Sequence, residues 1–173
     1  MTDEIEDNLI SRTSEHLRKD EDVEALKTAE SLERYKHEDA IALYMKGIAL
    51  YENKKFDDAL RYLSEAATIK KDEKRVWYGI GYTLIALNRI TEANDALKYV
   101  VSVDREHTGG HMGLFIINII EKNKEQAFYH LQKASENKEI TRHILEDLHK
   151  NLIKDSKIDD SLKNEIYNYI KEY

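Results

Sequence analysis

The 173 residues include no cysteine, no proline and only six glycines. The lack of cysteine excludes disulfides, thiolate zinc sites, iron–sulfur clusters and a cysteine nucleophile. Glycine and proline mark β-turns and hairpins, so their scarcity argues against a sheet. We therefore expect a chain that is nearly all helical, in which short polar connections join neighbouring helices into hairpins.

Basic charge is also in short supply, because 27 Lys and Arg face 34 Asp and Glu, for a net charge of −7. Binding to a phosphate backbone needs clustered basic residues, so we expect no nucleic-acid partner. The first residues, MTDEIEDN, are acidic where a secretory signal would be basic. No stretch reaches the roughly 18 apolar residues of a membrane helix. We expect no membrane segment and a cytoplasmic protein.

The chain does contain a repeat with a period of 34 residues. Gly47 and Gly81 are separated by this interval. Two gapless columns have the same period, one of Ala59, Ala93 and Ala127 and one of Leu63, Leu97 and Leu131. Each unit consists of an apolar helical pattern, a short polar break and a second helical pattern, so each is predicted to be a helix–turn–helix.

This pattern resembles the tetratricopeptide repeat. The family's signature is best matched by Trp77, Ile80, Gly81, Leu84, Ala93 and Leu97. The resemblance implies an all-α solenoid of stacked hairpins with extra helices at both ends. Its three units would be residues 40–73, 74–107 and 108–141, flanked by an acidic helical pair at 1–39 and capping helices at 142–173. The N-terminal pair is either an eroded repeat or an unrelated extension.

Small residues in the repeat predict close helix contacts. Glycine costs about 1 kcal/mol relative to alanine inside a helix, so Gly47 and Gly81 are expected where a facing helix that carries Ala59 or Ala93 comes near. The third unit departs from the pattern, with Phe115, His111 and Asn118 at the glycine, aromatic and leucine positions. Either its helices splay apart or its register shifts toward Gly113.

In this family the first helix of each repeat lines a concave groove. By resemblance, the positions that face the groove are Ile41, Tyr44, Ile48, Tyr51, Arg75, Tyr78, Tyr82, Ile85, Met112, Ile116 and Ile119. An open apolar surface of this extent predicts a bound partner, and tyrosine offers such a partner an apolar ring and a hydroxyl. The alternative is that these tyrosines are ordinary packing between repeats.

The last segment of the chain carries a second apolar stripe that needs a contact. It comprises Leu162, Ile166, Tyr169, Ile170 and Tyr173. This helix would fold back as a lid, dock onto another copy and form a homo-oligomer, or simply cap the stack. The first helix of the third unit, apolar on nearly every side, is its nearest candidate contact.

A known ligand mode of the family clamps an acidic chaperone tail with Lys and Asn residues. Tyr44 and Ile48 stand where the first Lys and Asn of the clamp would be, and Gly79 replaces the second Asn. Only Arg75 offers a nearby cation. We therefore expect weak or no binding to acidic chaperone tails.

The sequence offers little for catalysis, with no phosphate-binding glycine loop and no nucleophile elbow. His107 and His111 are four residues apart, but Thr108, Gly109 and Gly110 between them make a helix doubtful, and no acidic ligand accompanies them. We expect no catalytic residue, no metal and no cofactor. The remaining histidines, including His130, are interpreted as surface residues.

These features favour a non-catalytic protein–protein interaction module, an adaptor or scaffold that binds a peptide or helix with an apolar or aromatic segment. One alternative is a secretion-type or client chaperone, a class that has a similar three-repeat architecture. Another is a self-assembling scaffold whose C-terminal helix fills the groove of a second copy. The sequence does not name the partner.

Overall fold

The computed structural model describes residues 2–135, 164 and 168, and the capping helices expected at 142–173 lie outside these residues. Eight α-helices and no strand occur in the described part, as the all-α prediction requires. The chain forms two compact units, Met1–Ala96 and Leu97–Tyr173, and each is described by itself. No helix among the described residues is both long and apolar enough to cross a membrane.

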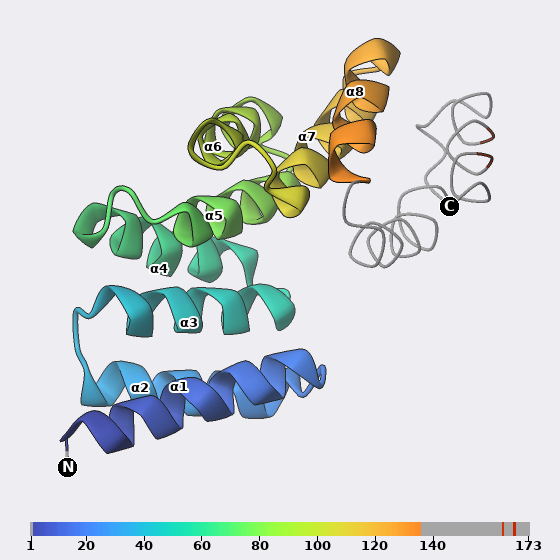
Figure 1. Ribbon diagram of the computed structural model, residues 1–173. Coiled ribbons are helices and arrows are strands. Elements are labelled where there is room, and N and C mark those ends of the chain that lie inside the picture. Colours follow the sequence, from blue (N-terminus) through green and yellow to red (C-terminus); the bar gives the residue numbers. More distant parts are fainter. Residues whose placement is uncertain (1, 136–163, 165–167, 169–173) are drawn as a thin grey trace. The chain divides into compact units, whose positions relative to one another are not determined.

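The first unit stacks helical hairpins. Its helices are α1 (Thr2–Arg18), α2 (Asp22–Tyr35), α3 (Ala40–Glu52), α4 (Phe56–Ile69), α5 (Lys74–Ala86) and the start of α6 (Ile90–Val103). Figure 1 shows α3 between the α1–α2 hairpin and α4 with α5. Helices close in sequence are therefore also neighbours in space, as expected when short connections join hairpins.

Corresponding helices end and begin one 34-residue period apart. The first helices of successive hairpins end at Arg18, Glu52, Ala86 and Ile120, and the second helices begin at Asp22, Phe56, Ile90 and Lys124. The α1–α2 hairpin is in phase with the later ones. The acidic N-terminal pair therefore has the helix boundaries of a further repeat, although its sequence departs from the motif.

The turn inside each hairpin uses a left-handed residue that is not glycine. These residues are Asp20 (φ 56°), Lys54 (φ 60°), Asn88 (φ 57°) and Lys122 (φ 58°). Each turn is also closed by a backbone bond between residues five apart in the sequence, for example from Lys55 N–H to Leu50 O at 2.9 Å. This is the bond pattern that usually ends a helix at a glycine. The chain thus makes sharp helix ends without glycine or proline.

Replacing Lys54 with glycine should stabilise the protein. A side chain in the left-handed region costs about 1–2 kcal/mol, and glycine removes that cost while adding some entropy to the unfolded chain. We expect Lys54→Gly to raise the free energy of unfolding by about 0.5–1 kcal/mol in urea denaturation. Lys27→Gly is the control, because Lys27 is an exposed residue inside α2, where glycine should cost about 1 kcal/mol. A loss in both variants would contradict this account.

Gly47 permits the close approach of α3 and α4, as its column predicted, but its contact is a leucine. A Cβ at Gly47 would lie 2.6 Å from Leu63 Cγ and 3.3 Å from the Leu63 backbone nitrogen. The expected facing residue, Ala59, is fully buried on the same helix. Leu63 is also fully buried, so its side chain has no free space into which it can move.

We expect Gly47→Ala to destabilise the protein by about 1–3 kcal/mol, because overpacking against Leu63 outweighs the better helix propensity of alanine. Gly79→Ala is the comparison, since its Cβ would meet only side-chain ends, Ile48 Cδ1 at 3.0 Å and Leu63 Cδ1 and Cδ2 at 3.3 Å. Thermal unfolding of both variants checks the difference. Equal stability losses would show that the closer approach of Gly47 to Leu63 Cγ is not the cause.

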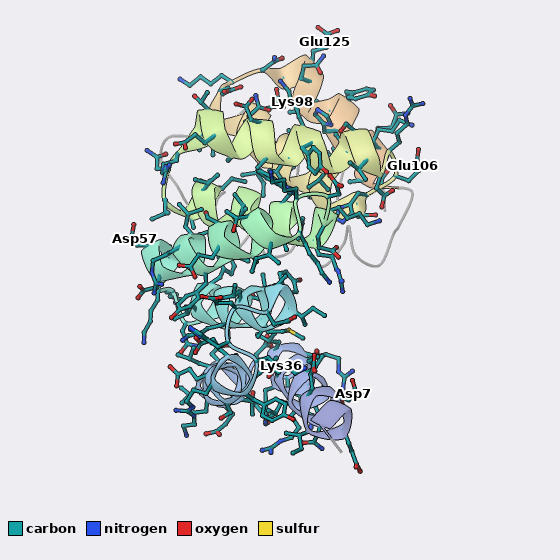
Figure 2. The ribbon with its side chains drawn as sticks, turned by 90° about the vertical axis from the view of Figure 1, so that its left-hand side faces the viewer. Asp7, Lys36, Asp57, Lys98, Glu106 and Glu125 are labelled. Atoms are coloured by element: carbon teal, nitrogen blue, oxygen red, sulfur yellow. The ribbon has the colours of Figure 1, made fainter. Side chains whose placement is uncertain are left out.

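The N-terminal hairpin replaces the small residue of the motif by a buried hydroxyl pair. Thr13, which occupies the column of Gly47, is fully buried and lies 3.0 Å from Thr28 Oγ1. Lys36 contacts α1, because its Nζ lies 2.7 Å from Glu6 Oε2. Lys36 and Asp7, the residue that follows Glu6, are labelled in Figure 2. The pairing of these two helices therefore rests on polar contacts as well as on apolar burial.

The second unit contains α7 (Thr108–Ile120) and α8 (Lys124–Ala134), which pack against each other. The doubt about a helix at Thr108 was wrong, because α7 begins there and His107 caps it by accepting the Gly110 N–H at 2.9 Å. Every side chain from 111 to 119 is buried. The helix bounds keep the 34-residue period and show no shift toward Gly113.

Candidate functional site

Four tyrosines of α3 and α5 form what we call the tyrosine face: Tyr44, Tyr51, Tyr78 and Tyr82. All four are partly exposed, and the two helices contact each other. The rings of Tyr78 and Tyr82 lie 4.8 Å apart, centroid to centroid, at 52°. Repeat spacing places the tyrosines of each helix on one side of that helix, and Tyr44 and Tyr51 influence the pKa values of Tyr78 and Tyr82 respectively, so the four residues line the junction of two successive hairpins.

Burial sets the electrostatics of this face. It raises the pKa of Tyr44 and of Tyr78, and it raises the pKa of Tyr82 well above the ordinary value. The neighbouring Tyr78 hydroxyl raises the pKa of Tyr82 further. The hydroxyls therefore stay neutral at physiological pH, and although those of Tyr78 and Tyr82 bond to each other, a phenol oxygen can still accept a further hydrogen bond.

Arg75, the one cation predicted at this surface, is already paired. Its Nε and Nη2 lie 3.0 Å from Glu73 Oε1 and Oε2, which is a bidentate ion pair. Its guanidinium carbon lies 6.0 Å from the centroid of the Tyr44 ring. The pair neutralises much of the charge that Arg75 would otherwise offer to a ligand carboxylate. The tyrosine face is consequently close to neutral.

The structure distributes the other predicted groove residues unevenly. Ile41, Ile48 and Ile85 are partly exposed, and Ile41 packs with Tyr44 against the small core of Leu32, Ala42 and Met45. Met112, Ile116 and Ile119 are buried within the second unit, at 0%, 6% and 6% exposure. These three side chains offer no open surface. The predicted residues that the structure brings together are those on α3 and α5.

Sequence reasoning missed an apolar pocket of about 710 Å³ between α4, α5 and the start of α6. Its apolar wall consists of Leu60, Ala67, Trp77, Ile80, Leu84 and Ala96. Trp77, Ile80 and Leu84 matched the repeat motif and were assigned no binding role. Their spacing along the helix could have indicated a second surface, because it places them on the side of α5 away from Tyr78 and Tyr82.

His111 and His130 form a contact in the second unit that corrects the surface assignment of His130. Their Nδ1 atoms lie 2.9 Å apart, and His111 Nε2 lies 2.8 Å from Arg105 O. A carbonyl only accepts, so His111 carries its proton on Nε2 and accepts from His130 at Nδ1. Partial burial, His111 and Lys98 lower the pKa of His130 to about 4. No group of three or more metal-ligating residues occurs in the described part.

The depressed pKa of His130 predicts acid sensitivity. The unfolded chain binds a proton near the ordinary value of 6.5 and the folded chain only near 4, so stability falls as the pH drops through this window. Between pH 7 and pH 5 we expect the wild type to lose about 1–2 kcal/mol more than His130→Gln. Urea unfolding at several pH values measures this. Parallel profiles for the two proteins would contradict the assignment.

Comparisons with known proteins agree on the architecture. Two sequence models described as "Tetratricopeptide repeat" match residues 24–74 and 50–111. No curated protein matches the chain in sequence. Together the two matched segments run from α2 to the beginning of α7 and include the tyrosine face and the pocket.

Solved structures with similar folds are distant in sequence. A MamA structure from Desulfovibrio magneticus RS-1 has a TM-score of 0.68 at 18% identity, with 97% of this chain and 94% of that chain covered. An O-GlcNAc transferase mutant from Thermobaculum terrenum has a TM-score of 0.73 at 14% identity. The match covers 79% of this chain but only 26% of the transferase chain. YrrB, a TPR protein with an unusual peptide-binding site, has a TM-score of 0.64 at 21% identity, with 76% and 70% covered.

Proposed function

The chain belongs to the tetratricopeptide repeat family, and from this premise we propose that it is a non-catalytic interaction module that binds a peptide or helix on the tyrosine face. The single observation that carries the proposal is the gathering of four partly exposed tyrosines over the junction of α3 and α5. Aromatic side chains of this kind are enriched at the centres of protein interfaces.

The chemistry of the tyrosine face selects among ligands. Its rings provide apolar area at a low cost in side-chain entropy, and its neutral hydroxyls can bond the backbone of a bound segment. Arg75 is paired with Glu73, which disfavours an acidic tail as the ligand. The proposal therefore specifies an uncharged segment with apolar or aromatic side chains. YrrB, which has a similar fold, carries a peptide-binding site, and this supports the same class of function for the present chain.

Peptides selected from a random 12-residue display library would test the proposal. We expect Tyr44→Phe combined with Tyr78→Phe to weaken the dissociation constant of the best selected peptides about tenfold, because each lost hydroxyl removes a hydrogen bond worth about 0.5–1.5 kcal/mol. Fluorescence anisotropy with labelled peptides measures the effect.

Tyr129→Phe is the matched control, since Tyr129 is 50% exposed on α8 and lies outside the tyrosine face. It should leave the affinity unchanged. Equal affinities for all three proteins, with the fold intact by circular dichroism, would remove the tyrosine face as the binding surface.

The same selection separates the two alternative functions. A client chaperone would enrich many unrelated apolar sequences in place of one motif. A self-assembling scaffold would lose mass in light scattering when residues 158–173 are deleted. One enriched motif together with an unchanged mass is the result that the interaction module predicts.

A further inference from the structure

We propose that the pocket between α4, α5 and α6 is a second docking site, which takes an amphipathic helix of a partner protein with a basic residue beside its apolar stripe. This site goes beyond the tyrosine face and does not depend on it. Trp77, Ile80 and Leu84 line the pocket, whereas Tyr78 and Tyr82 lie across the same helix. One helix therefore serves two surfaces that can be occupied separately.

The wall of the pocket is apolar and rigid. Ile80 and Leu84 are 6% and 4% exposed, so only a small part of each side chain faces the cavity. The indole of Trp77 is held in place because its Nε1–H donates to Lys71 O at 2.7 Å. Its polar atom is thereby satisfied, and the partly exposed ring remains as apolar wall. A side chain that enters the pocket meets apolar groups that are already in place, so little entropy is lost on binding.

The surroundings of the pocket favour a helix as the ligand. Its walls are helices, whose backbone groups bond within each helix, so no strand edge is available to pair with an extended peptide. A helical segment satisfies its own backbone and can insert apolar side chains that are three or four residues apart.

Charged residues at the edge of the pocket indicate which charges the ligand helix should carry beside its apolar stripe. On the α6 side, Arg89 is held by Glu92 through two bonds of 2.7 and 2.6 Å. Asp95 lies nearly one turn after Glu92 on α6 and has no ion pair among the described residues. Two carboxylates and one guanidinium leave a charge of −1 on this side. A Lys or Arg next to the apolar stripe of the ligand would complement it.

A basic residue from another part of the chain also lines the pocket. Lys71, in the connection between α4 and α5, is exposed and makes no ion pair among the described residues. A ligand helix with a basic flank and an acidic flank would match Asp95 and Lys71 in a single orientation. The pocket therefore selects for the orientation of the bound helix as well as for its apolar stripe.

Trp77 makes the proposal directly testable, because it is the only tryptophan of the chain. The probe is a synthetic 16-residue helical peptide with leucines at i, i+3, i+4 and i+7, a lysine flank, a glutamate flank, and no Trp or Tyr. Titration into the full-length protein should shift the Trp77 emission to shorter wavelength and saturate. No shift at saturating peptide would overturn the proposal.

A charge swap tests the orientation. We expect Asp95→Lys to weaken binding of the probe about fivefold and a peptide with its flanking lysines changed to glutamate to recover the loss. Asp7→Lys is the matched control, since Asp7 lies on α1 in the same unit, far from the pocket in the sequence, and carries the same change in charge. Equal weakening by both variants would show a general electrostatic effect and overturn the specific site.

Two further measurements keep the result unambiguous. Ser64→Phe, which places a ring at the pocket wall, should abolish the shift while circular dichroism stays unchanged. Tyr78→Phe with Tyr82→Phe should leave the shift intact, so failure of the tyrosine face and failure of the pocket are distinguishable. If the Trp77 emission shifts as the protein concentration rises without peptide, and the mass rises with it, a second copy of the chain occupies the pocket. That result would overturn the proposal of a partner helix.

Discussion

The left-handed turn that closes each hairpin is the constraint on which the rest of the structure depends. It recurs at Asp20, Lys54, Asn88 and Lys122, and at each position a side chain occupies backbone space that favours glycine. Each turn separates the two helices of its hairpin by three residues, so helix boundaries repeat in phase along the chain. That phase determines which side chains of successive hairpins meet.

Close packing follows from the same phase. Gly47 lies against the buried Leu63 with no room for a Cβ, and Thr13 fills the equivalent place in the N-terminal hairpin by bonding to Thr28. Two different solutions therefore satisfy one geometric need. A glycine lets the helices approach, whereas a threonine hydroxyl makes a specific polar contact at the cost of a less apolar interior.

The helix α5 shows how a repeat protein can hold two surfaces on one element. Tyr78 and Tyr82 lie with the tyrosines of α3, while Trp77 and Ile80 turn toward α4 and the pocket. A shift of one residue along a helix turns a side chain by about 100°, which is enough to change its neighbours entirely. Both surfaces depend on the fixed position of this helix, so damage to the hairpin would affect both.

The sequence by itself determined the period, the helical content, the position of the polar breaks and the row of tyrosines, because these depend on local patterns and on contacts between neighbouring repeats. Only the tertiary structure decided that Met112 is buried, that His130 bonds to His111 and that the residues around Trp77 line an open pocket. The physical reason is that burial and hydrogen-bond pairing depend on how the space between helices is filled. Periodicity says which side a residue faces, but not how much room it finds there.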